Sequence, residues 1–334
     1  MTVKRKTKKD KPIKIDYISS GIPPLDMILG GGFAVGRYSH VHGAKSTGKS
    51  LLAYHAAYQV QKMGGTFVYI DSEAAWSDIA KCVGVNEDDM LYYTPSDSTP
   101  IQLSFTVQTI FSYIEEVLLE KVKSGDDTPI LVVWDSIAAS TTDEEATKGF
   151  GERTVASSAR NISKGLRKLT ALISRAQAHI MFINQHRTKI GGNQIFGDGM
   201  EPTSGVAIDY YASQSVELKR PRVDYQKVHK ARVPIGVTTN AWIAKNKVGI
   251  PFGECTLPIL WNKGVDIPKS CFLWLKDWGF VTVKGGWHYI TIGDDEISFR
   301  EAEWEEKVYR LHEEDVLRLV HSCTVSAVME GKIS

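Results

Sequence analysis

A glycine-rich segment early in the chain has the residue types and the spacing that bind a phosphate group. Residues 43–50 read Gly-Ala-Lys-Ser-Thr-Gly-Lys-Ser, a complete G-x-x-x-x-G-K-[ST] motif. In such a loop backbone N–H groups surround the phosphates, the lysine reaches the β- and γ-phosphates, and the final hydroxyl binds Mg²⁺. The predicted phosphate-binding residues are Gly43, Ala44, Lys45, Ser46, Thr47, Gly48, Lys49 and Ser50.

The residues on both sides of this loop support the prediction. Residues 37–42 read as a strand, and residues 51–58 contain helix formers without glycine or proline. A strand, a glycine-rich turn and a helix N-terminus together direct backbone N–H groups and the helix dipole at an anion. A chance glycine turn is the alternative, and both flanking segments argue against it. The chain is therefore expected to bind a nucleoside triphosphate.

Two carboxylates and an amide could complete a hydrolytic site. Glu73, Asp135 and Gln185 each come at or just after the end of a predicted strand. Because the carboxyl ends of parallel strands meet at one edge of a sheet, these side chains should gather beside the phosphate loop. There Asp135 can hold Mg²⁺ with Ser50, and Glu73 can orient and deprotonate the attacking water. The Gln185 amide could hydrogen-bond the γ-phosphate. The alternative interpretation of Glu73 is an acidic residue of a surface loop without a catalytic role.

Hydrophobic strands alternate with helical stretches along most of the chain. This alternation predicts an α/β fold with a mostly parallel central sheet and helices on both faces. The predicted strands cover residues 37–42, 66–71, 129–135 and 179–184, with two later ones at 215–219 and 241–245, and the longest predicted helices cover 101–122 and 155–176.

A change of composition near residue 264 predicts a second, smaller domain. The chain there becomes rich in Trp and Gly and then ends in a helical stretch at residues 301–320. The expected organisation is a basic arm at residues 1–17, a nucleotide-binding core at residues 18–263, and a small α+β C-terminal domain at residues 264–334.

Length and composition agree with a folded protein of about two domains. The chain has 334 residues, of which 43% are hydrophobic, enough for a substantial core. No apolar run reaches the roughly 18–20 residues that a membrane span needs, and no apolar segment follows the N-terminal basic residues as in a secretory signal. The four cysteines show no C-x-x-C spacing, so neither a zinc site nor a disulfide framework is expected. These features predict a cytoplasmic protein.

The charge of the chain is unevenly distributed. The formal net charge is +1, but residues 1–16 carry seven Lys or Arg against two Asp, a net of +5. Such an arm either contacts nucleic acid or is a solvated tail, and the sequence leaves both open. The remainder is slightly acidic, so overall charge does not indicate a nucleic-acid binder.

The order of these motifs resembles that of RecA-type recombinases. The resemblance runs from residue 18 to residue 289, about four-fifths of the chain, and the C-terminal part is also similar to the UvsX branch of phages. Each motif is shared with other ATPases of this core, but the ordered set is specific. The matching segments are residues 18–26, 30–37, 43–50, 70–73, 132–136, 159–169, 182–185, 211–213, 245–247 and 264–289.

The resemblance implies a RecA-like core that binds ATP and Mg²⁺. By position, Glu73 is similar to the family's water-activating glutamate, Asp135 to its Mg²⁺ ligand, and Gln185 to the switch that couples the γ-phosphate to the loop behind it. Lys245 and Lys247 are similar to a pair that reaches the ATP of a neighbouring subunit and neutralises transition-state charge. The implied assembly is a filament in which two protomers complete each active site. A solvated strand end is the alternative for the two lysines.

A basic helix face and a long loop are the expected DNA contacts. In the helix at residues 155–176 an apolar stripe at helical spacing lies opposite basic and polar residues, although such a stripe is ordinarily a solvated face. The loop after Gln185 is long, basic and glycine-rich, and loops of this kind are usually functional or disordered. By resemblance it is the second DNA-binding loop, and residues 145–154 are the first. The expected DNA-binding residues are Arg160, Ser163, Arg167, Arg187, Lys189, Phe196 and Gly205.

Several positions depart from the family's pattern. Residues 204–206 read Ser-Gly-Val where the family has Gly-Gly-Asn, and Ser215 stands in place of an interface arginine. The aromatic groups expected around adenine fall at Ala80 and Pro268, and Trp76 is the candidate replacement. These differences indicate a divergent member of the family, such as a phage-encoded one.

Together these features predict an ATP-dependent recombinase that forms a filament on single-stranded DNA, tests double-stranded DNA for homology and exchanges strands. A hexameric DNA helicase on the same core is one alternative, but such motors usually carry an extra N-terminal domain, and this core begins within about 20 residues. A recombination mediator that binds ATP without hydrolysing it is the other. The presence of Glu73, Lys49 and Gln185 argues against such a mediator.

Overall fold

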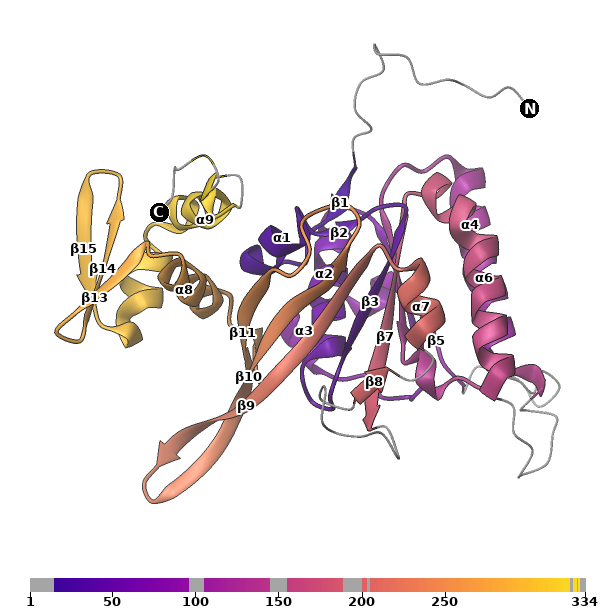
Figure 1. Ribbon diagram of the computed structural model, residues 1–334, viewed down its shortest axis with the longest axis horizontal. Helices are drawn as coiled ribbons and strands as arrows, with labels where there is room; N and C mark the ends of the chain where they lie inside the picture. The colour runs from indigo at the N-terminus through magenta and orange to yellow at the C-terminus, as the bar shows by residue number, and fades with distance from the viewer. Residues whose placement is uncertain are drawn as a thin grey trace, which may run out of the picture.

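The protein is built on one large sheet with helices on both faces (Figure 1). The computed structural model describes residues 15–95, 105–144, 155–188, 200–202, 205–324, 327, 328 and 330. Neighbouring strands pair in parallel across the centre of the sheet, which confirms the predicted mostly parallel α/β fold. In spatial order these strands are β9 (Gln214–Val228), β3 (Arg37–Gly43), β7 (Ala178–Thr188), β6 (Ile130–Asp135), β4 (Thr66–Asp71) and β5 (Met90–Tyr93).

Antiparallel strands extend this sheet at one edge. Beyond β9 come β10 (Ala231–Asn246), β11 (Glu254–Leu260) and β12 (Gly264–Val265), and β8 (Met200–Pro202) pairs with the end of β7. A separate two-stranded sheet joins β1 (Tyr17–Ile18) to β2 (Phe33–Ala34). The central strands are hydrophobic throughout because both of their faces are covered, as in β6, where Leu131 and Val133 face one core and Val132 and Trp134 the other.

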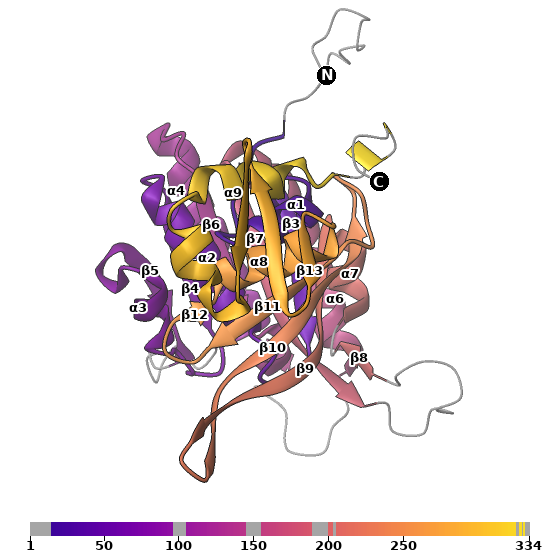
Figure 2. The ribbon, with the colours of Figure 1, turned by 90° about the vertical axis from the view of Figure 1, so that its left-hand side faces the viewer.

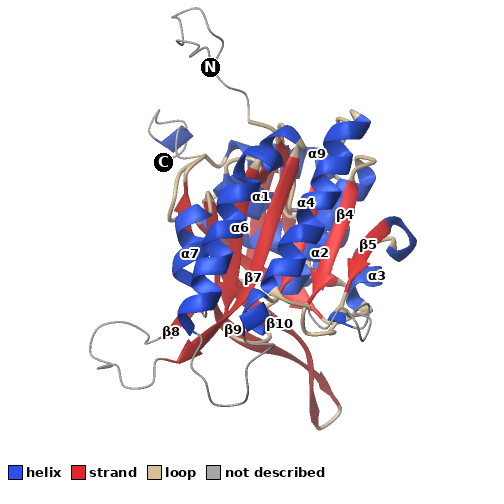
Figure 3. Ribbon diagram, turned by 90° about the vertical axis from the view of Figure 1, so that its right-hand side faces the viewer, coloured by secondary structure: helices blue, strands red, loops and turns tan. Residues whose placement is uncertain are grey.

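Helices divide between the two faces of the sheet (Figure 3). One face carries α1 (Pro23–Leu29), α2 (Lys49–Lys62) and α3 (Ile79–Val83). The other face carries α4 (Val107–Ser124), α6 (Val155–Arg175) and α7 (Gly205–Tyr211). Short 3₁₀ turns at Glu87–Asp89 and Ile137–Ala139 complete the connections. None of the helices in the described ranges is long and apolar enough to cross a membrane.

The two long predicted helices form with small corrections. Helix α4 begins at Val107 rather than at residue 101, because Thr106 caps it and accepts a hydrogen bond from the Thr109 N–H. In α6 the predicted apolar stripe is buried at Ile162, Leu166, Leu169 and Ile173. Ala159 has the spacing of the same stripe but is exposed.

Close packing of α4 on α6 depends on Gly165. A Cβ atom at this position would lie 2.5 Å from the ring of Phe111, which itself packs edge-on against Trp134 with ring centroids 5.3 Å apart. We expect Gly165→Ala to destabilise the protein by about 1–2 kcal/mol, since overpacking outweighs the gain in helix propensity. Urea unfolding of the variant measures this effect. Lys164→Ala, on the exposed side of the same turn, is the control and should change stability by less than about 0.5 kcal/mol. An unchanged midpoint for Gly165→Ala would contradict the packing argument.

The strands predicted at residues 215–219 and 241–245 are parts of a far longer hairpin. Strands β9 and β10 pair from Gln214 with Asn246 to Val228 with Ala231, and their tip projects from the body (Figure 2). Tyr225 and Val233 near the tip are 48% and 41% exposed, and Arg232 lies 4.3 Å from the Tyr225 ring centroid. No hydrophobic alternation predicts these residues as strand because neither face is buried; cross-strand hydrogen bonds satisfy the backbone instead.

The C-terminal residues form an α+β unit beside the sheet (Figure 2). It consists of α8 (Ile267–Asp277), an antiparallel sheet of β13 (Val281–Lys284), β14 (Trp287–Ile292) and β15 (Asp295–Phe299), and α9 (Glu313–Ser322). Its buried residues join the hydrophobic cluster of α1 and α2, and α8 and α9 pack on α1. The boundary at residues 263 and 264 remains a prediction.

The single helix predicted at residues 301–320 is wrong. The chain forms a 3₁₀ turn at Glu301–Glu303, a π-helical turn at Glu305–Tyr309, and then α9 as a separate helix. Trp304 is 2% exposed and donates a hydrogen bond from Nε1 to the Pro268 carbonyl oxygen. Anchoring Trp304, Val308 and Val316 in one core requires a change of direction that helical periodicity alone does not reveal.

Candidate active site

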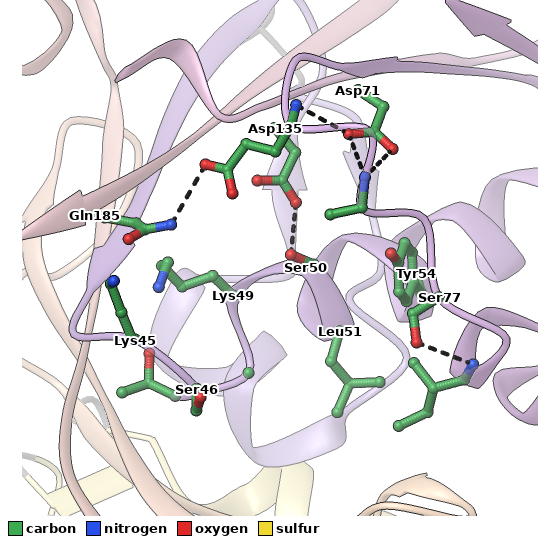
Figure 4. Close-up of a pocket in the computed structure, with 15 residues that line it drawn as sticks. Lys45, Ser46, Lys49, Ser50, Leu51, Tyr54, Asp71, Ser77, Asp135 and Gln185 are labelled. Carbon is green, nitrogen blue, oxygen red and sulfur yellow. Dashed lines mark hydrogen bonds between the residues drawn. The ribbon is translucent and has the colours of Figure 1, made fainter. Parts of the chain in front are cut away.

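The predicted phosphate loop connects β3 to α2 at the carboxyl edge of the sheet and borders a cavity of about 520 Å³ (Figure 4). Gly48 has φ of +92°, and a Cβ atom there would lie 2.4 Å from Cδ1 of Ile259. At Gly43 a Cβ atom would lie 2.5 Å from the carbonyl oxygen of Leu218. Both motif glycines are therefore required by the shape of the loop itself. The loop residues that line the cavity are Lys45, Ser46, Thr47, Gly48, Lys49 and Ser50.

Ser50 and Asp135 meet in this cavity. The Ser50 hydroxyl donates to Oδ2 of Asp135 at 2.5 Å, and the Tyr69 hydroxyl donates to the same oxygen at 2.8 Å. Burial raises the pKa of the Asp135 carboxyl, while these two hydrogen bonds oppose the shift. A serine hydroxyl beside a carboxylate is a set of hard oxygen donors, which fits Mg²⁺. The arrangement is the one that the predicted Mg²⁺ ligands require.

Lys49 is almost fully buried beneath the loop. Its Nζ donates to the carbonyl oxygen of Ala44 at 2.7 Å. Burial lowers the pKa of the Lys49 ammonium, and the nearby Asp135 and Glu73 carboxylates oppose this effect. The ammonium thus lies within the loop, next to the carboxylates of the cavity, where a phosphate group would compensate its charge.

Glu73 and Gln185 both line the cavity and contact each other. Oε1 of Glu73 accepts a hydrogen bond from the Gln185 amide at 3.3 Å and one from the Ser136 hydroxyl at 2.5 Å. The predicted base and the predicted switch are therefore in direct contact.

Two residues that were not predicted as site residues position this pair. Ser136 holds the Glu73 carboxylate, and Asp71 accepts hydrogen bonds from the backbone N–H groups of Glu73 at 3.2 Å and Ala75 at 2.9 Å. The Tyr92 hydroxyl fixes the Asp71 carboxylate in turn, at 2.7 Å. An aspartate two residues before Glu73 is the available signal, because this spacing is typical of an Asx turn.

Trp76, the candidate replacement for the aromatic groups expected around adenine, is not among the residues that line the cavity. Its ring packs edge-on against Tyr54 and Tyr69, each with centroids 4.9 Å away, and its Nε1 donates to Glu87 at 2.7 Å. Among the described residues the aromatic ring that lines the cavity is that of Tyr54. Ala80 and Pro268 are both buried.

Lys245 and Lys247 lie at the opposite edge of the sheet from this cavity. Asn246 pairs with Gln214 at the start of β9, and Gln214 pairs with Ser39 near the start of β3, whereas the phosphate loop follows the other end of β3. Both lysines donate to carbonyl oxygens at the end of α7. Burial and the neighbouring Lys247 lower the pKa of Lys245. Within one chain, therefore, the two lysines do not line the nucleotide cavity.

Three of the predicted DNA-binding residues lie on α6. Arg160 and Arg167 are exposed, and neither has an ion-pair partner among the residues that the structure describes. The Ser163 hydroxyl donates to the Ala159 carbonyl oxygen of the same helix at 2.9 Å.

The remaining predicted DNA contacts flank or belong to the second loop. Arg187 belongs to β7, where its backbone pairs with Glu201, and Gly205 begins α7. Lys189 and Phe196, like the predicted first loop at residues 145–154, lie outside the described residues.

Comparison with known proteins agrees with this geometry. A profile described as the RecA N-terminal domain matches residues 2–266. The chain belongs to the RecA family. Among the relatives of this RecA-type protein are Protein RecA of Prochlorococcus marinus, 33% identical over 277 residues, and Protein RecA of Thermotoga neapolitana, 33% identical over 279 residues. The matches cover 83% of this chain and 68% and 74% of the two relatives, respectively. The protein is accordingly an ATP-dependent DNA recombinase and a DNA-dependent ATPase.

Proposed function

We propose that this RecA-type protein forms a helical filament on single-stranded DNA, with each ATP held between two protomers, and that the filament pairs with homologous double-stranded DNA and exchanges strands. One observation supports an ATP site that is shared between two protomers. The phosphate loop, Asp135 and Glu73 lie at one edge of the sheet, and Lys245 and Lys247 lie at the other. Head-to-tail stacking brings opposite edges of successive protomers together and generates an open helix if the rotation does not close.

Within each site the chain's own residues divide the work of hydrolysis. The loop N–H groups and Lys49 hold the phosphates. Ser50 and Asp135 would hold Mg²⁺, which would neutralise charge on the phosphate oxygens. Glu73, fixed by Ser136, orients the attacking water and takes its proton. Lys245 and Lys247 of the next protomer stabilise the charge that develops in the transition state.

Electron microscopy with single-stranded DNA and a non-hydrolysable ATP analogue tests the assembly. A helical filament that forms only with both ligands is the expected result. A closed ring would instead favour the hexameric helicase, and separate monomers would contradict a site shared between protomers. We place this activity in the cytoplasm of a bacterial or phage-infected cell.

Gln185 is proposed to couple ATP to DNA affinity. Its amide contacts Glu73, and its backbone continues along β7 toward the second loop. A hydrogen bond from the Gln185 amide to a γ-phosphate would therefore affect both the Glu73 contact and the position of this backbone. We expect Gln185→Ala to bind ATP normally but to lose the difference in single-strand affinity between the ATP analogue and ADP. Fluorescence anisotropy with both nucleotides measures this difference. If the variant keeps the parent's nucleotide dependence, Gln185 is not the switch.

The exposed face of α6 is proposed to bind the phosphates of DNA without reading sequence. We expect Arg160→Ala and Arg167→Ala each to weaken binding equally on all sequences and to reduce the salt slope by up to about 0.7. Lys168→Ala is the matched control on the same helix, because Lys168 already donates to Glu115 at 2.5 Å and its charge is compensated. A control slope that falls as much as those of the two arginine variants would contradict the assignment. By the same proposal Phe196 stacks on bases, and Arg187, Lys189 and Gly205 contact the backbone.

A further inference from the structure

A histidine and an aspartate connect the strand of the phosphate loop to the helix that holds the two lysines. His40 lies in β3, three residues before Gly43, and Asp209 lies near the end of α7. The His40 Nδ1 is 2.5 Å from Oδ1 of Asp209. A carboxylate oxygen only accepts hydrogen bonds, so Nδ1 carries the proton. The His40 side chain is fully buried, whereas that of Asp209 is 43% exposed.

Asp209 provides the only hydrogen bond to the His40 ring among the residues that the structure describes. The other ring nitrogen, Nε2, is buried and has no partner there. His42, two residues further along β3, has its ring centroid 4.5 Å away and is hydrogen-bonded to Ser215 of β9 at 3.0 Å. The strand therefore fixes the position of the imidazole, and the imidazole in turn holds Asp209.

The backbone of the same aspartate binds a lysine. The Asp209 carbonyl oxygen accepts a hydrogen bond from Nζ of Lys245. The next carbonyl, that of Tyr210, accepts from Lys245 at 3.4 Å and from Lys247 at 3.3 Å. The negative charge of Asp209 also opposes the lowering of the Lys245 pKa, which favours a charged ammonium in this half-buried place.

We propose that His40 and Asp209 form a positioning pair that sets Lys245 and Lys247 for the neighbouring protomer's nucleotide. The inference rests on the proposed function, in which these lysines act across the interface. Strand β3 leads into the phosphate loop of its own protomer. Through His40 and Asp209, the same strand also fixes Lys245 and Lys247, which this protomer presents to the ATP of its neighbour. The pair is thus a mechanical link between successive sites along the filament.

A bound cation is a weaker interpretation of the same residues. His40, His42 and Asp209 place possible ligand atoms within 4.8 Å of one another. However, the ammonium groups of Lys245 and Lys247 lie against the same helix end and would repel a divalent ion. We therefore expect equimolar Zn²⁺ to leave the melting temperature of the parent unchanged. A rise in the parent that Asp209→Asn abolishes would overturn the positioning pair in favour of a metal site.

Mixed filaments test the proposal directly. Asp209→Asn keeps the shape of the side chain. We expect it to lower kcat of the DNA-dependent ATPase by about 10- to 100-fold with little change in KM for ATP. The reason is that the variant misplaces Lys245 and Lys247, which do not line the protomer's own nucleotide cavity. Mixed one to one with Glu73→Gln protein, it should regain activity. One partner then supplies the glutamate and the other supplies correctly placed lysines, at roughly a quarter of the interfaces if mixing is random.

A second mixture distinguishes an error in the proposed His40–Asp209 pair from an error in the proposed ATP site between protomers. Lys245→Ala/Lys247→Ala protein mixed with Glu73→Gln protein should recover in the same way. If that mixture recovers and the Asp209→Asn mixture does not, the positioning pair is wrong while the shared site stands. If neither recovers, the shared site is wrong as well.

Variants of His40 show whether the effect comes only from lost folding. His40→Asn keeps an N–H donor near the position of Nδ1, and His40→Leu removes it. We expect the asparagine variant to retain most of kcat and the leucine variant to resemble Asp209→Asn. If His40→Asn and His40→Leu lost the same amount of activity and the same amount of melting temperature, the role of His40 would be merely structural.

Discussion

Replacement of Glu73 by glutamine is expected to slow ATP hydrolysis by about 100-fold or more while ATP binding persists. The amide keeps the size of the side chain and can still contact Gln185, but it cannot take a proton from water. Ser136, which donates to Glu73 at 2.5 Å, holds the carboxylate in the cavity. Single-turnover hydrolysis with protein in excess, together with a nucleotide-binding assay, measures both steps.

Glu120→Gln is the matched control for this experiment. Glu120 is an exposed carboxylate of α4, away from the residues that line the cavity, so its variant should hydrolyse ATP at the parent rate. Should Glu73→Gln also hydrolyse at the parent rate, Glu73 has no part in the chemistry. Weakened binding with unchanged turnover would give it a role in nucleotide affinity instead.

Removal of Lys245 and Lys247, which we propose to act across the interface, should be equally severe. We expect Lys245→Ala/Lys247→Ala to lose about 100- to 1000-fold in turnover, because cations at the transferring phosphoryl group supply effects of this size. Nucleotide binding by the isolated protomer should persist, since the cavity is lined by residues from the other edge of the sheet. In the parent, the rate per protomer should rise with protein concentration until filaments saturate. Lys263→Ala/Lys307→Ala, which removes two other exposed lysines, is the control.

Measurement of specific activity on dilution could contradict an ATP site shared between protomers. If the parent kept the same specific activity at every concentration while sedimentation showed only monomers, each protomer would hydrolyse ATP alone. Lys245 and Lys247 would then be ordinary caps of the α7 carbonyls. Within one chain the lysines and the phosphate loop lie at opposite ends of β3, so the two lysines could act on ATP only across an interface between protomers.

The sequence alone determined the parts of this protein that depend on neighbouring residues. The motif at residues 43–50 specifies a phosphate loop, and hydrophobic runs such as Ile130–Asp135 specify strands buried on both faces. Strand ends in a parallel sheet share one edge, so the meeting of Ser50 with Asp135 and of Glu73 with Gln185 followed from order along the chain.

Only the tertiary structure decided features that depend on residues distant in the sequence. The tip of the β9–β10 hairpin buries no face and has no periodic signal, and the break before α9 serves a core shared with α1. His40 and Asp209 are 169 positions apart, and nothing in either local sequence indicates their contact. The separation of Lys245 from the cavity likewise follows from antiparallel pairing of β10 with β9. Such contacts are selected by burial and backbone pairing across the whole sheet, which local patterns do not encode.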